Sequence, residues 1–403
     1  MKALLFAWKN VLRNRRRSFV TILIAAVGTL SVLVGGGFAL YTYSMLIDAS
    51  AREFGHLTVA ARDYFDRDEE TPMQYGVAAA PALAARLEKD PRVLRVIPRV
   101  SLSGLFANGD KSMIFVGTGV DIRAEAAIRG PFLKVVEGGL GDAGRGTAQV
   151  LLGTDLAHSL NAHPGTGLTL LATTTAGAMN AVDVEVAGVV TTGWRELDKR
   201  LVDMDLASAQ RLLLTDKVST LSVYLDGTDA TPAALAELAG ADPAHVYKPW
   251  WEQAFYYHSV RGLYDRIFGL LGCIITALVV FSVANTLAMA VVERTREIGT
   301  LRALGALPAE IVGQFVREGA LIGATGAAIG TLLAMVVVLV LPSMGLEMPP
   351  PPGRSVGYPL LVSFSLPLYL IADGAIVLLC AGAAWFVSRK AAKKPIVEAL
   401  GHV

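Results

Sequence analysis

The sequence predicts an α-helical integral membrane protein with four transmembrane helices and a large α+β extracytoplasmic domain. The first observation is composition: 53% of the 403 residues are hydrophobic and 18% are charged, whereas soluble domains have about 45–50% and about 25%. The second is a set of four long apolar runs. The third is a segment of about 215 residues between the first two runs, which is enough for one or two soluble domains. Together they exclude a disordered, collagenous or coiled-coil chain.

Net charge and cysteine usage narrow the class further. The chain has 36 basic and 35 acidic residues, a net charge of +1, which gives no global signature of nucleic-acid binding. The His residues are scattered, and none pairs with Cys or carboxylates at the spacing of metal ligands. Cys273 and Cys380 both lie inside apolar runs, which excludes a secreted domain held together by disulfides.

The first uncharged run covers residues 18–47. As a helix its 30 residues would be about 45 Å long, enough to cross a hydrocarbon core of about 30 Å. The run is much longer than the apolar stretch of about 7–15 residues in a signal peptide, so we expect a membrane helix that is not removed. Further runs cover residues 267–292 and 319–346, and a fourth, interrupted only by Asp373, covers residues 355–388.

The basic residues beside these runs orient the helices. They cluster before the first run (Lys2, Lys9, Arg13, Arg15, Arg16 and Arg17), between the second and third (Arg294, Arg296, Arg302 and Arg317) and after the fourth (Arg389, Lys390, Lys393 and Lys394). The loop between the third and fourth runs has only Arg354. By the positive-inside rule, both termini and the second loop lie in the cytoplasm, and the long segment after the first helix lies outside.

This orientation divides the chain into nine parts. We expect a cytoplasmic basic amphipathic helix (1–17), a first membrane helix (18–47), an external core domain (48–260), a stalk with the second membrane helix (261–292), a cytoplasmic coupling loop (293–318), a third membrane helix (319–346), an external loop (347–364), a fourth membrane helix (365–388) and a cytoplasmic tail (389–403).

Short apolar or β-branched stretches in the external segment predict strands, with helical patterns between them. Strands are expected over residues 56–60, 93–105, 111–120, 168–173, 182–190 and 221–225, and helices over 81–89, 154–160, 206–214 and 232–239. Asn108-Gly109 predicts a tight hairpin between the second and third of these strands. The mixture predicts an α+β domain.

The external segment offers little catalytic chemistry. Its sequence has no nucleophile elbow, no paired metal ligands and no phosphate-binding loop. Asp198, Asp203 and Asp205 are close in sequence and are the one candidate carboxylate cluster. We interpret the three as part of a solvated loop rather than as a site.

An aromatic segment leads from the external domain into the second membrane helix. It includes Trp250, Trp251, Phe255 and Tyr256. Aromatic side chains beside a membrane helix are typical of the membrane–water interface, so we expect an interfacial stalk, with the second helix beginning outside the bilayer. The alternative is that these aromatics bind substrate.

The third membrane helix carries regularly spaced glycines. Gly319 and Gly323, and Gly326 and Gly330, are each four residues apart, which makes a smooth strip where another helix can approach closely. The strip fits packing within one subunit and dimerisation equally well. No run carries repeated polar residues along one face, as an aqueous path for ions or solutes would require.

Two carboxylates lie in or beside the membrane helices. Asp373 is the one charge inside a run. Counting back about 20 residues from the cytoplasmic end of its helix predicts contact with water near the outer surface. Glu318 stands where the third helix leaves the cytoplasm, and we expect the dipole at the helix N-terminus to stabilise its charge.

The loop between the second and third membrane helices predicts a short amphipathic helix. Ile298, Leu301 and Leu304 recur at helical spacing among charged residues. Gly305 is expected to end this helix, and Pro308 to start the next. Such a helix suits docking into a groove of a partner, but it could equally lie on the membrane surface.

This loop resembles the corresponding segment of permeases of the MacB/FtsX class of ABC transporters. The likeness rests on Glu293-Arg-Thr-Arg-Glu-Ile-Gly-Thr-Leu-Arg-Ala-Leu-Gly305, on Glu318 and the glycines of the third helix, and on the amphipathic, basic segment over residues 8–17. The strings Val150-Leu-Leu-Gly-Thr-Asp-Leu-Ala157 and Pro164-Gly-Thr-Gly-Leu-Thr-Leu170 are similar to the periplasmic core domain of MacB-like members. With the order of the helices, the likeness covers essentially the whole chain.

The resemblance implies a mechanism called mechanotransmission. Two permease subunits pair, and each binds a cytoplasmic ATPase through the helix between the second and third membrane helices. ATP-driven closure of the ATPases then moves the external domains, where the cargo is handled. The docking residues implied in this chain, with Glu297 and Arg302 as the favoured polar contacts, are Glu293, Arg294, Glu297, Ile298, Leu301, Arg302, Leu304 and Gly305.

Nucleotide binding is expected elsewhere. The chain has no Gly-x-x-x-x-Gly-Lys-[Ser/Thr] motif, so we expect a separate ATPase subunit to bind ATP and Mg²⁺. The chain itself is expected to be non-catalytic, without cofactor or metal. Its expected partners are that ATPase, a second permease copy or a paralogue, membrane lipids, and a periplasmic adaptor, lipoprotein carrier or hydrolase; nucleic acid is not expected. The implied location is the bacterial inner membrane.

Three functions fit the resemblance. The first is export or extraction of an amphiphilic cargo such as a lipoprotein, as in LolC/LolE-like members, and the expected separate ATPase favours it. The second is efflux through an adaptor and an outer-membrane channel, as in MacB-like members. The third is an FtsX-like signalling scaffold that activates a cell-wall hydrolase, for which the external domain is large. A membrane-tethered enzyme is disfavoured because no catalytic constellation occurs.

Overall fold

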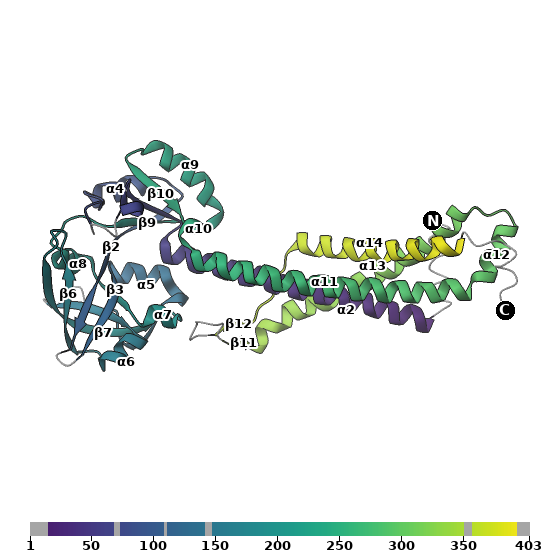
Figure 1. The fold of residues 1–403 in the computed structure, drawn as a ribbon, viewed down its shortest axis with the longest axis horizontal. Helices are drawn as coiled ribbons and strands as arrows, with labels where there is room; N and C mark the ends of the chain where they lie inside the picture. Colours follow the sequence, from purple (N-terminus) through teal and green to yellow (C-terminus); the bar gives the residue numbers. More distant parts are fainter. Residues whose placement is uncertain (1–14, 68–72, 109–110, 142–146, 350–356, 393–403) are drawn as a thin grey trace. The chain divides into compact units, whose positions relative to one another are not determined.

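The computed structural model describes residues 15–67, 73–108, 111–141, 147–349 and 357–392. Most of the predicted amphipathic helix over residues 1–17 and of the tail therefore lies outside the described residues. The chain forms two compact units (Figure 1). The helical unit comprises Met1–Tyr43, Arg261–Glu347 and Pro359–Val403, and the sheet unit comprises Ser44–Val260 and Met348–Tyr358.

Within the described part of the chain, the helical unit is built from four long helices: α2 (Arg15–Phe54), α11 (Phe255–Glu293), α13 (Pro308–Val340) and α14 (Leu366–Ala392). All four are long and apolar enough to cross a membrane, which confirms the predicted fold class here. α2 has 40 residues, a length of about 60 Å, or twice a hydrocarbon core of about 30 Å. Its residues from Ser44 onward belong to the sheet unit.

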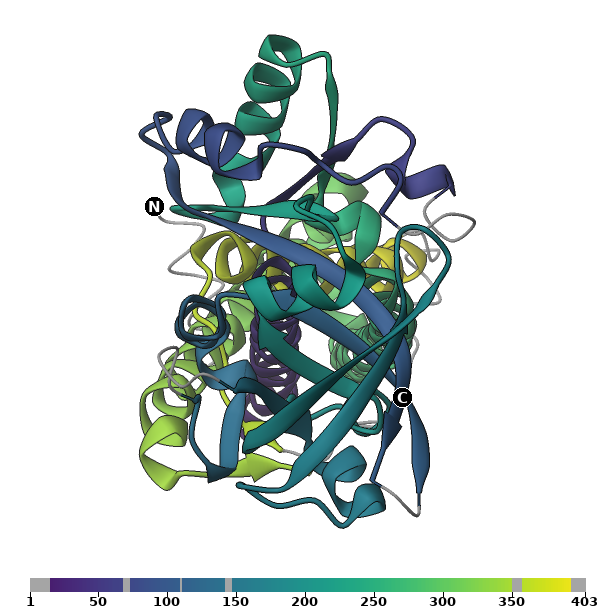
Figure 2. The ribbon, with the colours of Figure 1, turned by 90° about the vertical axis from the view of Figure 1, so that its left-hand side faces the viewer.

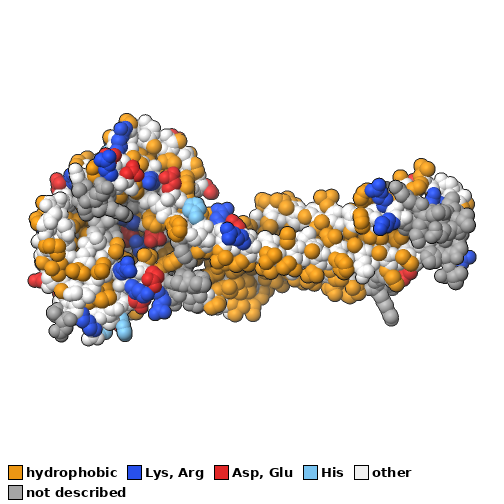
Figure 3. Space-filling model, in the orientation of Figure 1, with side chains coloured by type: hydrophobic (Ala, Val, Ile, Leu, Met, Phe, Trp, Pro, Cys, Tyr) orange, Lys and Arg blue, Asp and Glu red, His pale blue; other side chains and the backbone are white. Residues whose placement is uncertain are grey.

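The outer surface of these helices is largely apolar. Figure 3 shows hydrophobic side chains along the helices, with Lys and Arg gathered at the end that carries α12 (Thr295–Ala303). Large side chains such as Leu278, Phe281, Leu339 and Leu378 are exposed. An apolar surface of this extent is unfavourable in water, and helices, whose backbone groups are bonded internally, suit a lipid environment.

The glycine strip of α13 faces two helices of the same chain. A Cβ atom on Gly330 would lie 2.5 Å from the backbone oxygen of Ala26 in α2, and one on Gly319 would lie 2.7 Å from that of Cys380 in α14. Only glycine permits such an approach of two backbones. The strip contacts α14 through Gly319 and Gly323 and α2 through Gly326 and Gly330.

In the sheet unit, the described residues form a sheet of ten strands in the order β10-β1-β9-β2-β3-β8-β5-β7-β4, with β6 beside β2 and β7. The strands are β1 (Leu57–Ala61), β2 (Val93–Ala107), β3 (Ser112–Val120), β4 (Lys134–Gly138), β5 (Ala148–Gly153), β6 (Gly167–Thr173), β7 (Met179–Thr191), β8 (Leu201–Asp205), β9 (Thr220–Leu225) and β10 (His245–Pro249). The mixture of strands and helices confirms the predicted α+β class.

Short helices cover this sheet and connect its strands. They are α3 (Tyr64–Arg67), α4 (Ala80–Leu87), α5 (Ile122–Arg129), η1 (Gly130–Phe132), α6 (Thr154–Leu160), α7 (Arg195–Asp198), α8 (Leu206–Leu213), η2 (Thr228–Ala230), α9 (Thr231–Ala241) and α10 (Trp250–Gln253). Between α13 and α14 lie η3 (Leu341–Met344), β11 (Glu347–Met348) and β12 (Tyr358–Pro359).

The predicted hairpin forms the centre of the sheet. β2 and β3 pair antiparallel, with Phe106 opposite Met113; Gly109 of the turn lies outside the described residues. Phe106 and Phe115 are fully buried, and their ring centroids are 5.0 Å apart. α8 packs against these strands (Figure 2), and the aromatic pair belongs to the main hydrophobic core.

The structure corrects the interpretation of the three aspartates. They do not form a solvated loop. Asp203 lies on β8 and is buried. Asp198 is also buried and accepts a hydrogen bond of 2.7 Å from the Thr192 hydroxyl. Asp205 caps α8 by accepting from the backbone N–H of Ser208 at 2.9 Å.

Candidate functional site

The cytoplasmic helix α12 forms where the sequence predicts it. Gly305, at φ +98°, follows the helix, a backbone conformation that favours glycine and ends helices. Pro308 is the first residue of α13, and the Glu310 carboxylate accepts from the backbone N–H of Leu307 at 3.0 Å. The segment is therefore a short helix that Gly305 ends, and Pro308 starts the next helix.

The apolar residues of α12 divide into an inner and an outer group. Ile298 is buried in a cluster with Val291, Ile311 and Phe315, so its side chain is not available to a partner as the sequence analysis implied. Leu301 is half-buried. Leu304 is 80% exposed, and Leu307, just beyond the helix, is 62% exposed. The apolar surface that α12 offers to a partner is therefore at its C-terminal end.

A buried ion pair attaches the start of α12 to α13. Arg294 Nη1 lies 3.0 Å and 3.1 Å from the two carboxylate oxygens of Glu318, and the side chains are 14% and 10% exposed. Burial alone would lower the pKa of Arg294, but the charges and hydrogen bonds of Glu318 and Glu297 together outweigh burial and raise the pKa. Arg294 also contacts Glu297 at 3.2 Å and the Phe315 ring.

This pair corrects the prediction for Glu318. α13 begins at Pro308, so Glu318 lies well inside the helix, where the dipole of the N-terminus has little effect. Its charge is balanced by Arg294 instead. Of the other implied docking residues, Glu293, Glu297 and Gly305 are exposed and Arg302 is half-buried.

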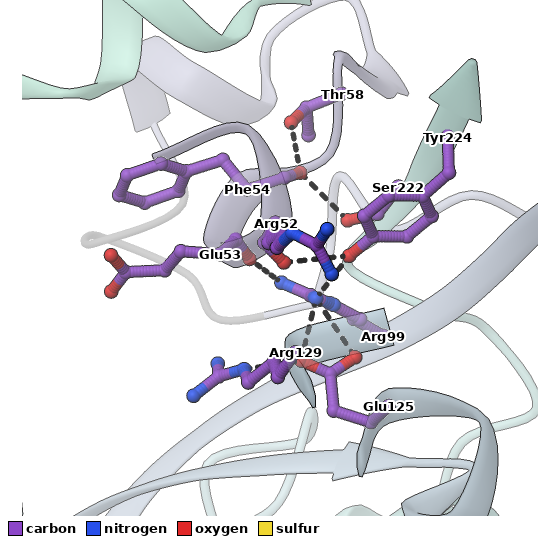
Figure 4. Close-up of polar contacts among 9 residues, drawn as sticks. All are labelled: Arg52, Glu53, Phe54, Thr58, Arg99, Glu125, Arg129, Ser222 and Tyr224. Atoms are coloured by element: carbon purple, nitrogen blue, oxygen red, sulfur yellow. Dashed lines mark hydrogen bonds and ion pairs between the residues drawn. The ribbon is translucent and has the colours of Figure 1, made fainter. Parts of the chain in front are cut away.

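A second polar site holds the C-terminal end of α2 in the sheet unit (Figure 4). The last carbonyl groups of a helix have no partner within it. Here three successive carbonyls accept hydrogen bonds from side chains: Arg52 from the Tyr224 hydroxyl at 3.2 Å, Glu53 from Arg99, and Phe54 from the Ser222 hydroxyl at 2.9 Å and the Thr58 hydroxyl at 3.0 Å.

Arg99 is the centre of this second site. Its Nη2 donates to both carboxylate oxygens of Glu125, at 2.7 and 2.8 Å, and to the Tyr224 hydroxyl at 2.7 Å. Glu125 in turn accepts from Nε of Arg129 at 2.7 Å. Arg99 is 11% exposed and Glu125 is 3% exposed, so the ion network is shielded from water.

Burial shapes the acid–base properties of this region. It raises the pKa of Tyr224 to about 12 and that of Asp203 to about 6. For Arg129, burial alone would lower the pKa, but the negative charges around it, with Glu125 and Asp203 the largest, together outweigh burial and raise the pKa. No hydrogen-bond partner for Asp203 Oδ2 is found among the described residues.

The stalk aromatics do not share one environment. Trp250 is buried against Ala51 of α2 and the ring of Tyr257, whose centroid is 5.1 Å away. Trp250 therefore packs inside the protein, and its place at the membrane interface stays a prediction. Trp251 is half-buried and Phe255 is exposed; the side chain of Tyr256 lies outside the described set.

The carboxylate inside a membrane helix has a partner. Both oxygens of Asp373 on α14 lie within hydrogen-bond distance of the Thr331 hydroxyl on α13, at 2.9 and 3.1 Å. Its depth relative to a bilayer stays a prediction. Across the described ranges, no group of three or more His, Cys, Asp or Glu is placed to hold a metal ion.

Sequence reasoning missed the residues around the end of α2. Arg99 and Tyr224 are separated by 125 positions, so no local motif links them. The one available signal is that Arg99 lies among the mainly apolar residues at the start of β2, where a buried charge calls for a partner; Arg95 in the same stretch is exposed.

Two protein families match the chain. The family described as MacB-like periplasmic core domain matches residues 18–241, and the one described as FtsX-like permease C-terminal matches residues 269–396. The lipoprotein-releasing system transmembrane protein LolC of Xylella fastidiosa is 25% identical over 324 residues, which are 79% of this chain and 73% of LolC.

Two further relatives are similar over shorter stretches. The lipoprotein-releasing system transmembrane protein LolE of Haemophilus influenzae is 26% identical over 264 residues, 64% of this chain and 63% of LolE. The macrolide export ATP-binding/permease protein MacB of Nitrobacter winogradskyi is 30% identical over 150 residues, 35% of this chain and 23% of MacB.

Proposed function

The chain belongs to the MacB/FtsX-type permeases of ABC transporters, since the MacB-like periplasmic core family matches more than half of it, and we propose that it converts ATP hydrolysis by a separate ATPase into movement of its external domain. In this proposal the helical unit spans the inner membrane with both termini in the cytoplasm. The sheet unit is then periplasmic, and a second permease copy or a paralogue completes the transporter.

The observation that carries the proposal is the attachment of α12 to two membrane helices. Ile298 packs with Val291 of α11 and with Ile311 and Phe315 of α13. The Arg294–Glu318 pair adds a directional contact to α13. A helix that only rests on a lipid surface needs no buried ion pair to its neighbours. A force applied to α12 would therefore move α11 and α13 together, as docking of an ATPase requires.

The cargo proposed is an amphiphile such as a lipoprotein, extracted from the outer leaflet and released. Two of the three relatives compared carry the name of a lipoprotein-releasing system, which supports this choice over macrolide efflux. The spans also favour work outside the bilayer. Within the apolar runs over residues 18–47, 267–292, 319–346 and 357–388, the one Asp or Glu is Asp373, which is bonded to Thr331. A single such pair is no aqueous path.

The test is Leu304→Asp in the full-length chain expressed with its ATPase. A charge placed in an apolar groove is desolvated without a partner and costs several kcal/mol, so we expect the ATPase no longer to co-purify. Leu214→Asp is the matched control, because Leu214 is exposed on the sheet unit and its change should leave co-purification intact. Unchanged co-purification of Leu304→Asp would contradict docking through α12 and favour a surface-lying helix.

A further inference from the structure

The polar contacts around the C-terminal end of α2 have a use beyond stability. We propose that Arg99, Glu125, Arg129 and Tyr224, here called the α2 clamp, form the joint through which movement of α2 enters the external domain. The inference rests on the proposed function, because it assumes that the membrane helices move when ATP is hydrolysed.

The hydrogen bonds to the last three carbonyls of α2 all run in one direction, from side chains to the backbone. Arg52, Glu53 and Phe54 each present a backbone carbonyl at the end of α2, and all three accept from side chains of the sheet unit. The donors lie on β2 and β9, which are paired neighbours in the sheet. Hydrogen bonds depend strongly on angle. Three of them at one helix end therefore oppose rotation of α2 as well as its withdrawal.

The charges of the α2 clamp match its position at a helix C-terminus. Arg99 faces the C-terminal end of α2, where the helix dipole favours a cation, and Glu125 holds its guanidinium with two hydrogen bonds. A buried ion network contributes little net stability compared with apolar residues of the same volume. What it provides here is a fixed geometry, because Arg99 donates from Nη2 to Glu125 and from Nη1 to the Glu53 carbonyl at the same time, and the planar guanidinium can do so in one orientation only.

The end of α2 is attached to several elements of the sheet unit. The Arg52 guanidinium donates to the backbone oxygen of Ile128 in α5 at 2.8 Å, and Arg129 at the end of α5 donates to Glu125 of the same helix. The end of α2 is thus tied to β2, β9 and α5 at once. For α2 to turn the external domain, both of its ends must be fixed, and the α2 clamp fixes the end in that domain.

The start of α11 is held differently. Trp250 and Tyr257 pack with Ala51 in an apolar cluster, and apolar contact is non-directional. Apolar surfaces can therefore slide where the α2 clamp cannot. We infer that α2 fixes the orientation of the external domain, whereas the start of α11 can adjust during the movement.

Pulsed electron paramagnetic resonance tests the joint in the full-length chain. Spin labels at Ser44→Cys on α2 and Ile114→Cys on β3, in a Cys273→Ser, Cys380→Ala background, report the distance from helix to sheet. We expect a narrow distance distribution, and one at least twice as broad after Arg99→Met. Arg95→Met is the matched control, since Arg95 is exposed on the same strand. A second label pair, Ile114→Cys and Leu214→Cys, should stay narrow and shows that the domain is folded.

Different outcomes of these measurements contradict the α2 clamp and the proposed function. An unchanged width for Arg99→Met in the folded domain overturns the clamp. If that variant does not fold, Tyr224→Phe decides, because it removes one hydrogen bond to α2; an unchanged width there overturns the clamp as well. With the ATPase bound, ATP should shift the Ser44–Ile114 distance distribution less than the distance between Ile114 labels of two copies. If ATP shifts neither of these two distances in the chain with an unmutated clamp, the role of the clamp in transmission is overturned, even where the Ser44–Ile114 distribution is narrow.

Discussion

Removing the Glu318 carboxylate should destabilise the cytoplasmic end of the helical unit. Glu318→Ala leaves the Arg294 guanidinium buried, 14% exposed, without its main partner. Removing one partner of a buried ion pair costs about 3–5 kcal/mol, because the remaining charge is desolvated and uncompensated. Glu297 stays 3.2 Å from Arg294 and offsets part of that cost. We therefore expect the free energy of unfolding to fall by about 2–3 kcal/mol.

Replacing both partners distinguishes a lost charge balance from lost packing. Arg294→Met with Glu318→Met keeps most of the buried volume and removes both charges, so it should cost about 1 kcal/mol or less. The double variant should thus be more stable than Glu318→Ala alone, which is the reverse of additive damage. The free energy of unfolding is measured by chemical denaturation in mixed micelles.

Two results would refute this reasoning. One is a Glu318→Ala variant within about 0.5 kcal/mol of the natural chain, the range of a surface substitution. The other is a double variant less stable than the single one. ATPase co-purification provides a separate readout, because Glu318→Ala should loosen α12 and weaken docking while the double variant retains Ile298 in its cluster.

Three further predictions concern topology, helix packing and pH. Cysteines at Asn108 and Lys394 should be labelled from opposite sides of the membrane by an impermeant reagent, and labelling from one side only would contradict the proposed orientation. Gly330→Ala should destabilise the helical unit by about 1–3 kcal/mol, because the new Cβ would lie 2.5 Å from the backbone oxygen of Ala26; Gly382→Ala, where nothing lies within 4 Å, is the control, and equal melting temperatures would refute the packing argument. Because the folded-state pKa of Asp203 is about 6, above its ordinary value of 3.8, the unfolded chain loses this proton first as the pH rises. The contribution of Asp203 to stability should therefore fall by on the order of 1 kcal/mol between pH 5 and pH 7.5. Asp203→Asn should remove that part of the pH dependence of the melting temperature, and an unchanged dependence would count against it.

The local elements of this protein follow from its sequence. Long uncharged runs can only be membrane helices or buried helices, and the basic residues beside them predict their orientation. Asn108-Gly109 predicts the β2–β3 hairpin, Gly305 predicts the end of α12 and Pro308 predicts the start of α13, because each signal rests on the backbone conformations that these residues themselves allow. Each of these signals acts within a few residues along the chain.

The environment of a side chain depends instead on which distant element packs against it. The helical spacing of Ile298 and Leu304 predicts an amphipathic helix, but only the fold turns Ile298 inward onto α13 and leaves Leu304 exposed. Glu318 is 24 positions from Arg294, and Arg99 is 125 positions from Tyr224, so neither contact has a local signature. Burying a charge is unfavourable unless a partner is brought to it. Tertiary structure supplies those partners, and for this reason it alone decides where both polar sites lie.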